Sequence, residues 1–371
     1  MAQDPYLLTP GPLTTSIATK SAMMHDWGSR DQAFIETTAR VRERLLLIAG
    51  ASDTHVCVPL QGSGTFVVEA TLGTLIPKDG KTLVVINGAY GDRMTEMLDI
   101  MGREYETYKT AEDVPSDPAE IDAILSKNLT ITHVAAVYCE TTSGILNPIA
   151  EIAAVVARQR RSLLIDAMSA FGALPLKAAD VTFDALMASS NKCLEGVPGM
   201  GFAIVRKKAL EVCAGNAHSL SLDLHAQWAG LEKSGQWRFT PPTQVIVALD
   251  KALDQFAGNG GTEGRIARYS ENCKILVEGM REMGFETLLP DELQAPIIVT
   301  FHSPADAAFK FETFYDLIAK KGYLIYPGKL TVAETFRIGC IGNLGETEMH
   351  GALDAVRSAI EMMGVTNLSP T

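Results

Sequence analysis

Short apolar runs alternate with amphipathic stretches over residues 56–205. Six of these runs are five or six residues long and rich in aliphatic residues, as buried strands are; they lie at 56–60, 82–86, 133–138, 162–166, 185–190 and 201–205. Stretches with helical spacing follow the first three, at 65–76, 90–102 and 148–160. This alternation predicts βαβ units, and therefore an α/β fold with a mostly parallel sheet.

The pattern becomes helical after residue 206. Two long helical stretches, 245–258 and 265–284, precede a second set of predicted strands (296–301 and 336–340) and helices (309–322 and 346–363). We therefore predict a large domain over residues 21–275 and a smaller α/β domain over 276–371. The Pro-rich residues 1–20 are predicted to lie extended over the body.

Composition narrows the classes of protein to consider. The 371 residues are 47% hydrophobic with a net charge of −12. No run of about 18 apolar residues occurs in the chain, and the N-terminal residues show neither the basic nor the apolar region of a signal peptide. We expect a cytoplasmic protein that neither spans a membrane nor binds nucleic acid, since acidic surfaces repel phosphate backbones. Six scattered cysteines without a CxxC pair, and seven histidines without HxH or HExxH spacing, predict neither disulfides nor a metal site.

Ligands of open α/β sheets bind where the strands end, so residues at those positions are candidates for chemistry. After the first predicted strand comes QGSGT, in which Ser63, Gly64 and Thr65 precede a helix. Glycine lets the backbone approach an anion, the hydroxyls can donate to it, and a helix N-terminus supplies free N–H groups. A phosphate fits these donors; an ordinary turn with an N-cap is the alternative interpretation.

Two charged residues follow buried strands in the same way. Asp166 closes SLLID and needs a cationic or N–H partner there, with a simple N-cap as the alternative. Lys192 follows ALMASS and precedes a Gly-rich loop. Loss of hydration would lower its pKa and favour the nucleophilic amine, which forms Schiff bases; a surface lysine in a turn is the alternative.

Tyr90 and Arg337 complete the set of candidates. Tyr90 follows TLVVI in NGAYGDR and could lie against a flat heterocycle, or serve packing or an interface. Arg337 stands inside the apolar run FRIGC, where a buried guanidinium requires an anion such as a carboxylate or phosphonate, or an internal ion pair.

Together these residues match the needs of pyridoxal 5′-phosphate (PLP). Ser63, Gly64 and Thr65 would hold its phosphate, and Asp166 would keep the pyridinium nitrogen protonated. Lys192 would form the Schiff base, and Tyr90 would stack on the ring.

The motifs that contain these residues also resemble those of the class V aminotransferases of PLP fold type I. The similarity covers nearly the whole chain and is carried by TPGP (9–12), QGSGT (61–65), NGAYGDR (87–93), CETTSGILNPI (139–149), IDAMSAFGA (165–173), SSNKCLEGVPGMGF (189–202), RFTPPTQ (238–244) and FRIGCIGN (336–343). The resemblance implies a large domain with a seven-stranded sheet. It also implies that Thr142 approaches the cofactor ring, and that Thr240 and Thr243 reach the phosphate in the neighbouring subunit of a homodimer with shared active sites.

Within that family the resemblance implies a ping-pong transamination from 2-aminoethylphosphonate to pyruvate, yielding phosphonoacetaldehyde and L-alanine. Lys192 would be the base, and Arg337 would bind first the phosphonate and then the carboxylate. Because a phosphonate carries more charge than one guanidinium neutralises, a second donor is needed, for which Arg30 and the N-terminal segment are candidates on charge grounds.

Three alternatives stay open. The same motifs resemble alanine:glyoxylate and serine:pyruvate aminotransferases. A cysteine desulfurase-type lyase needs a mobile cysteine, whereas Cys193 is expected to face the core because consecutive extended residues point opposite ways. A pyridoxal-binding sensor or a nucleotide-binding Rossmann module is the non-enzymatic alternative, although no GxGxxG with a following acidic residue supports the latter.

Overall fold

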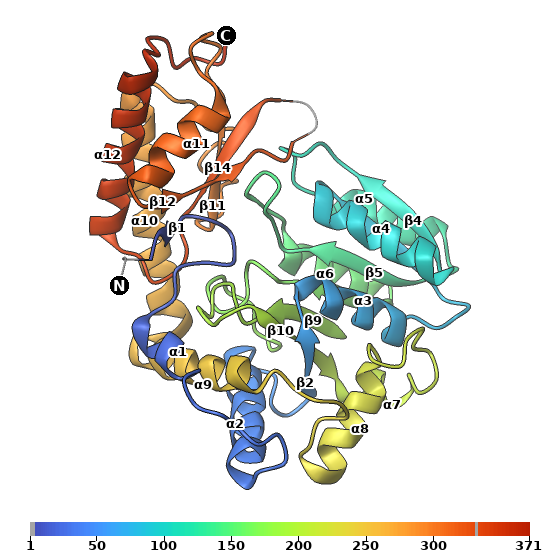
Figure 1. Ribbon diagram of the computed structural model, residues 1–371. Coiled ribbons are helices and arrows are strands. Elements are labelled where there is room, and N and C mark those ends of the chain that lie inside the picture. Colours follow the sequence, from blue (N-terminus) through green and yellow to red (C-terminus); the bar gives the residue numbers. More distant parts are fainter. Residues whose placement is uncertain (1–3, 331–332) are drawn as a thin grey trace.

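The largest layer of the computed structural model, which describes residues 4–330 and 333–371, is a seven-stranded sheet of order β2-β10-β9-β8-β5-β3-β4 (Figure 1). Its strands are β2 (His55–Gly62), β3 (Lys81–Ile86), β4 (Glu104–Lys109), β5 (Ile131–Val137), β8 (Ser162–Asp166), β9 (Ala185–Ser189) and β10 (Gly199–Arg206). Strands β9, β8, β5, β3 and β4 pair in parallel, and β10 runs antiparallel to both β2 and β9. The predicted α/β class and mostly parallel seven-stranded sheet are confirmed.

Helices cover both faces of this sheet. Helices α2 (Gln32–Ile48), α5 (Pro118–Lys127), α6 (Ile149–Arg158) and α9 (Thr243–Gly258) pack on one face, and α3 (Gly64–Leu75), α4 (Ala89–Met101), α7 (Lys207–Glu211) and α8 (Leu224–Ser234) pack on the other. Alternate strand residues serve the two cores: in β8, Leu163 and Ile165 lie in the first and Leu164 in the second. Burial on both faces explains why the strands read as continuous apolar runs.

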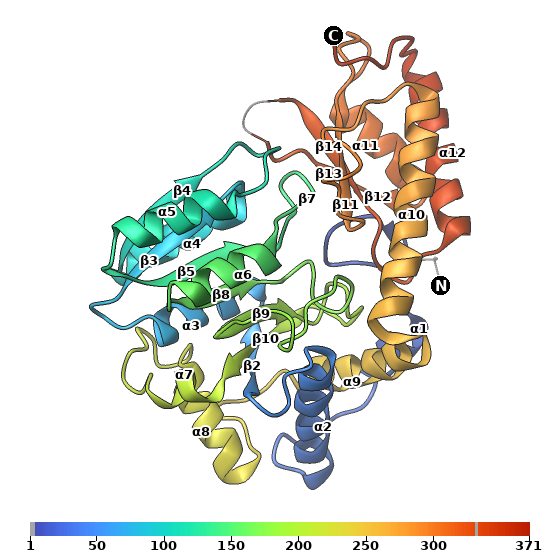
Figure 2. The ribbon, with the colours of Figure 1, turned by 180° about the vertical axis from the view of Figure 1, so that it is seen from behind.

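The C-terminal part of the chain forms a second, smaller layer. Strands β11 (Ile298–His302), β13 (Tyr326–Pro327) and β14 (Thr335–Gly339) form an antiparallel sheet, on which α10 (Gly261–Met283), α11 (Phe311–Lys320) and α12 (Glu346–Met363) pack (Figure 2). Helix α10 joins both parts, since Tyr269 lies in a core of the large sheet and Leu276 in that of the small one. The predicted boundary at residue 276 falls within this continuous helix and stays a prediction.

The N-terminal segment is extended and attached to the small sheet's side of the molecule. Strand β1 (Tyr6–Leu7) pairs in parallel with β12 (Tyr323–Leu324), and the Gly339 N–H donates to Leu8 O at 2.8 Å. The chain then passes to α1 (Ile17–Ser21), which lies beside α9. Residues 1–3 of the predicted segment lie outside the described residues.

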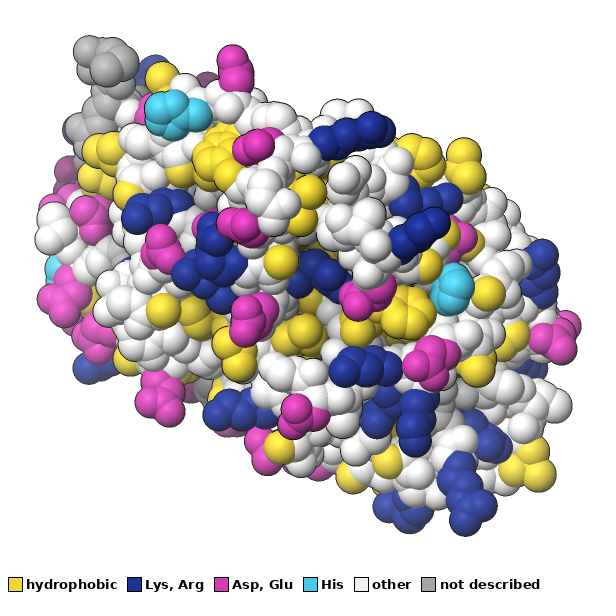
Figure 3. All heavy atoms as spheres, turned by 90° about the horizontal axis from the view of Figure 1, so that it is seen from below, with side chains coloured by type: hydrophobic (Ala, Val, Ile, Leu, Met, Phe, Trp, Pro, Cys, Tyr) yellow, Lys and Arg dark blue, Asp and Glu magenta, His cyan; other side chains and the backbone are white. Residues whose placement is uncertain are grey.

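A short hairpin of β6 (Cys139–Glu140) and β7 (Ile145–Leu146) follows β5 and completes the elements. No helix among the described residues has the length and apolar character needed to cross a membrane. On the face seen in Figure 3, basic side chains gather towards the lower right although the net charge of the chain is −12.

Candidate active site

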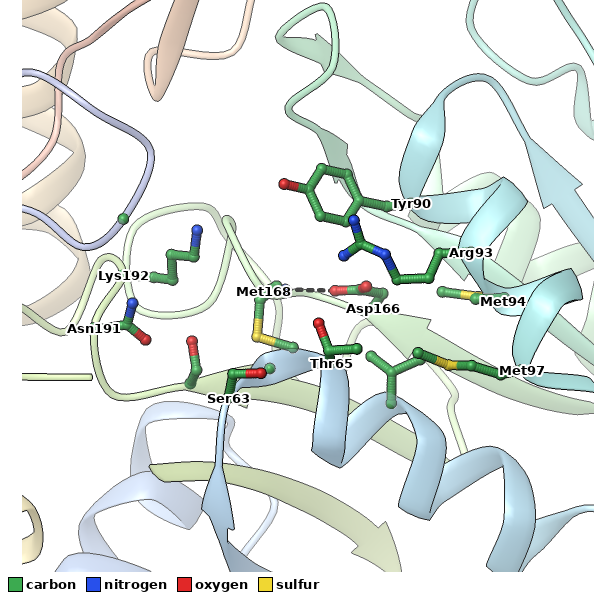
Figure 4. A pocket seen from close by; sticks show the side chains of 14 residues that line it. Ser63, Thr65, Tyr90, Arg93, Met94, Met97, Asp166, Met168, Asn191 and Lys192 are labelled. Carbon is green, nitrogen blue, oxygen red and sulfur yellow. Dashed lines mark hydrogen bonds between the residues drawn. The ribbon is translucent and has the colours of Figure 1, made fainter. Parts of the chain in front are cut away.

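Six of the predicted site residues line one cavity at the carboxyl ends of β2, β8 and β9 (Figure 4). They are Ser63, Gly64, Thr65, Tyr90, Asp166 and Lys192. Gly11, from the N-terminal segment, lies at the same cavity. Parallel strands end at one edge of the sheet, which is why residues more than 100 positions apart meet here.

The Ser63–Thr65 segment forms a shallow cradle at the start of α3. The Ser63 side chain makes no capping hydrogen bond, in contrast to the N-cap alternative. Neither its hydroxyl nor that of Thr65 bonds to a described residue, so both remain available to a ligand together with the first N–H groups of the helix. A Cβ on Gly64 would lie 2.4 Å from Sδ of Met168, so a larger residue here would require the Met168 side chain to move.

Asp166 ends β8 and is buried at the cavity wall. One carboxylate oxygen accepts the Met168 N–H at 2.9 Å, whereas the other has no hydrogen bond to a described residue. Burial raises the pKa of Asp166 to about 6, while the charges of Lys192 and Arg93 act in the opposite direction. The carboxylate is therefore largely ionised at neutral pH and has a free acceptor.

Lys192 lies across the cavity from Asp166, just after β9 (Figure 4). Its Nζ donates to Pro10 O at 2.5 Å. Burial lowers the pKa of Lys192 to about 8, and the positive charge of Arg337 adds to this effect. A considerable fraction of the amine is thus neutral near pH 8, as a nucleophile and base requires, and the surface-turn alternative does not describe this residue.

The loop after Lys192 is held by a buried charged cluster that the sequence analysis missed. Glu195 has a left-handed φ of 58° and forms ion pairs with Arg265, at 2.8 Å, and with Arg268. The Tyr269 hydroxyl donates to Glu195 at 2.6 Å. The helical spacing of Arg265 and Tyr269 on one face of α10, with buried Asn272, is the signal that could have indicated this cluster.

Thr142 is placed behind the cavity wall rather than on its surface. Its buried hydroxyl donates to Glu140 at 2.6 Å and accepts the Ala89 N–H at 3.0 Å. Glu140 also accepts the Tyr90 N–H at 3.2 Å, and burial raises the pKa of this carboxyl group. The sequence analysis missed Glu140, which ties the β6–β7 hairpin to the start of α4.

The Tyr90 ring has two cationic neighbours. The Arg93 guanidinium carbon lies 4.8 Å from the ring centre, and Lys329 Nζ lies 4.5 Å from it. In Figure 4, Arg93 lies between Tyr90 and Asp166. Neither cation was a candidate in the sequence analysis, because nothing in their local sequence distinguishes them from surface residues.

Arg337 is buried in β14 and close enough to act electrostatically on Lys192. Its Nη1 donates to Thr141 O at 2.7 Å and its Nε to Pro327 O at 3.1 Å, and burial lowers its pKa. It forms no ion pair with any acidic residue in the described part of the chain. The internal ion pair considered as an alternative is therefore not observed.

Thr240, Thr243 and the candidate second cation Arg30 do not line this cavity. Thr240 lines a separate hollow together with Arg30. Thr243 begins α9, and its hydroxyl donates to Gln244 at 2.8 Å.

Cys193 faces the core, as expected. Its Sγ donates to Ser169 O at 3.4 Å, and burial raises the pKa of the thiol to about 12. A fixed, protonated thiol does not match the mobile cysteine of a desulfurase.

Sequence comparisons find relatives of this chain among aminotransferases. The family model described as aminotransferase class-V matches residues 16–316. The chain is 54% identical to a 2-aminoethylphosphonate–pyruvate transaminase of Pseudomonas putida, over 99% of this chain and 100% of that one. It is 53% identical to 2-aminoethylphosphonate–pyruvate transaminase 1 of Polaromonas sp., covering 98% of each.

Solved structures share the fold at lower identity. The ureidoglycine–glyoxylate aminotransferase of Bacillus subtilis matches with a TM-score of 0.90 at 21% identity, over 99% of this chain and 95% of that one. The pyridoxamine–pyruvate aminotransferase of Mesorhizobium loti matches with a TM-score of 0.88 at 24% identity, over 98% and 94%. The family match over most of the sequence and the full-length relatives lead to one conclusion: this chain belongs to the class V aminotransferase family.

Proposed function

We propose that this protein is a PLP-dependent transaminase that moves the amino group of 2-aminoethylphosphonate to pyruvate, forming phosphonoacetaldehyde and L-alanine. The observation that carries the proposal is the presence of a half-buried Lys192 and a buried Asp166 in one cavity with an open phosphate cradle. The full-length relatives named for this reaction support the choice of substrates.

The donor set of the cavity fits PLP. The free hydroxyls of Ser63 and Thr65 and the N–H groups of α3 suit a phosphate. The unpaired oxygen of Asp166 suits a protonated ring nitrogen, and Tyr90 offers an aromatic face.

When bound, PLP supplies an aldehyde that condenses with amines and a ring that withdraws electrons from the adjoining carbon. Asp166 holds the proton on the ring nitrogen, and its burial strengthens that interaction. Lys192 Nζ takes the proton from the donor carbon that bears the amine, since its lowered pKa of about 8 leaves a neutral fraction at neutral to mildly alkaline pH. Arg337 orients the substrate anion.

The quaternary structure follows from the same proposal. Thr240 and Thr243 do not line the cavity of their own chain, so we assign them to the phosphate in the neighbouring subunit of a homodimer. Thr142 acts on the ring through the hydrogen bonds that fix Glu140 and the start of α4. A cytoplasmic location remains our expectation from the unpaired, mostly buried cysteines.

Alanine:glyoxylate and serine:pyruvate transamination are the alternatives that the same machinery could perform. Mixing the PLP-loaded enzyme with 2-aminoethylphosphonate or serine, without an acceptor, separates the donors, whereas alanine, the product of the proposed reaction, should react in every case. We expect 2-aminoethylphosphonate to change the cofactor absorbance in a single turnover and to release one equivalent of phosphonoacetaldehyde. A spectral change with serine but not with the phosphonate would refute the proposed donor.

A further inference from the structure

Three cations lie near Tyr90: Arg93 and Lys329 contact its ring, and Arg337 is close enough for the two groups to interact electrostatically. Arg93 belongs to α4, Lys329 to the loop after β13, and Arg337 to β14. Positive charges brought together repel one another, and burial increases that cost. An arrangement of this kind is stabilised when an anion binds between the cations.

The nearby carboxylates leave Lys329 and Arg337 without an ionic partner. Glu140 is the acidic group whose charge acts on Lys329, but its oxygens already accept hydrogen bonds from the Tyr90 N–H and from Thr142. The other nearby carboxylate, Asp166, interacts electrostatically with Arg93, which lies beside it (Figure 4). Neither Lys329 nor Arg337 forms an ion pair with another described residue. Burial, together with the charges of Arg93 and Arg337, lowers the pKa of Lys329. This direction is expected for an ammonium group that is partly desolvated beside other cations and has no bound anion.

The hairpin and the charges that act on each group together indicate the order of the two cations. Arg337 pairs across the sheet with Tyr326, and the Gly328 N–H donates to Thr335 O at 2.8 Å, so Lys329 follows directly beyond the paired strands. The pKa of Lys329 is affected by the charges of Arg93, Arg337 and Glu140. The pKa of Lys192 is also affected by the charge of Arg337. Because Arg337, and not Lys329, is among the charges that affect the pKa of Lys192, we infer that Arg337 is the inner cation, nearer the reacting lysine, and Lys329 the outer one.

This order matches the length of the donor. In alanine or pyruvate the carboxylate is attached to the carbon that carries the nitrogen or the keto oxygen. In 2-aminoethylphosphonate the phosphorus is attached one carbon further away, and the group carries up to two negative charges. A carboxylate can be bound by the inner cation, whereas a phosphonate extends towards the outer one.

Resting on the proposed function, we propose that Lys329 is a specificity-determining residue that binds the dianionic phosphonate of the amino donor together with Arg337, and that the carboxylate substrate does not need it. This assigns the second cation that the charge of the phosphonate requires. The interaction is a charge-assisted hydrogen bond from Nζ to a phosphonate oxygen.

Binding of an amine-free probe tests the inference separately from turnover. Ethylphosphonate and propionate are titrated calorimetrically into the PLP-loaded wild type, Lys329→Met, Lys329→Arg and the exposed control Lys320→Met, with thermal unfolding as a check of folding. We expect Lys329→Met to weaken ethylphosphonate binding by about 10- to 100-fold and to leave propionate binding within about twofold. Lys329→Arg should retain much of the phosphonate affinity, and the control should match the wild type.

Each outcome bears on the inference. Equal weakening of both probes, or unchanged ethylphosphonate binding in a folded Lys329→Met variant, overturns it. If ethylphosphonate binding depends on Lys329 but 2-aminoethylphosphonate does not change the cofactor absorbance, the anion site stands and the proposed donor is wrong. If 2-aminoethylphosphonate reacts, but Lys329→Met changes neither the KM for this donor nor the binding of ethylphosphonate, the proposed transaminase function stands and the role of Lys329 is rejected.

Discussion

The Nζ of Lys192 donates to the carbonyl oxygen of Pro10, 182 residues earlier in the chain, at 2.5 Å. The next residue, Gly11, lies against the same side chain: a Cβ on Gly11 would be 2.5 Å from Cδ of Lys192 and 2.8 Å from Asn191 O. The N-terminal segment, which is hydrogen-bonded to the small sheet through Leu8, is therefore part of the wall around the reactive amine.

Gly11→Ala should disturb Lys192 as well as the fold. The residue has φ of 119°, which disfavours a side chain, and the added methyl group would displace either the segment or Lys192. We expect kcat/KM to fall at least about tenfold, whereas Gly215→Ala, at φ of 82° with open space around it, should leave kcat/KM unchanged. Steady-state kinetics of both variants would check this, and equal losses would mean that backbone strain alone is responsible.

Lys192→Ala should abolish multiple turnover in a protein that still folds, because this amine is both the attachment point and the base. Borohydride reduction of the wild-type holoenzyme, followed by peptide mass mapping, should find the cofactor on Lys192. The exposed Lys127→Ala variant serves as the control. Label on another lysine, or appreciable turnover by Lys192→Ala, would contradict the assignment.

Asp166→Asn should inactivate the enzyme yet stabilise the apoprotein at neutral pH. The pKa is about 6 in the folded chain against an ordinary 3.8, so the folded state holds more protons between these values and its stability falls as pH rises through them. The difference corresponds to about 3 kcal/mol at most. Urea unfolding of the apoprotein should show Asp166→Asn more stable than wild type at pH 8, with the gap closing towards pH 4.

The exposed Asp53→Asn variant provides the matching control, and its stability should follow the wild type at both pH values. If the Asp166→Asn apoprotein were less stable than the wild type at pH 8, protein groups around Asp166 would already offset the cost of burying its negative charge. The cavity would then offer less to a protonated ring nitrogen than we propose.

Elements with a strong apolar pattern were predictable from the sequence. Helix α12 spans Glu346–Met363, the predicted range, and ends at Gly364, whose left-handed φ of 71° stops helices. Strand β4 was missed, because Glu104–Lys109 is an edge strand whose residues are all at least partly exposed and carry no apolar run. The pattern of apolar residues identifies a helix or strand only when one of its faces is buried against the rest of the protein.

The site divides in the same way. Asp166 and Lys192 could be identified because each directly follows or ends a buried strand. Glu140 and Lys329 could not, because their environments depend on contacts across loops and between the two sheets, and for Glu195 the signal lay only in its partners on α10. Charged residues in turns have no sequence signal that separates a buried partner from a solvated side chain.

Arg337→Ala should weaken the use of both substrates. The guanidinium is buried without an ionic partner among the described residues, so the substrate anion is its expected counter-charge. We expect a loss of about 2–5 kcal/mol in kcat/KM for 2-aminoethylphosphonate and for pyruvate alike. Arg357→Ala, which breaks an exposed pair with Asp354, should change neither. A near-normal kcat/KM would make Arg337 a purely structural residue that fixes Thr141 and Pro327.

Glu195→Gln should destabilise the protein because it leaves a buried guanidinium without its counter-charge. Arg265 is 2% exposed and has Glu195 as its ion-pair partner, so the expected loss is about 3–5 kcal/mol of unfolding free energy. Glu232→Gln removes an exposed partner of Arg42 and should cost about 1 kcal/mol or less. Urea unfolding measures both variants.

The position of Glu195 gives this variant a second consequence. Its N–H donates to Lys192 O at 2.8 Å, and its carboxylate is held by α10, the helix that extends into the core of the small sheet. Loosening the cluster should therefore alter the environment of Lys192 and shift the pH at which the cofactor absorbance titrates. A destabilised Glu195→Gln enzyme with an unchanged absorbance titration would show that the cluster supports the fold without positioning the lysine.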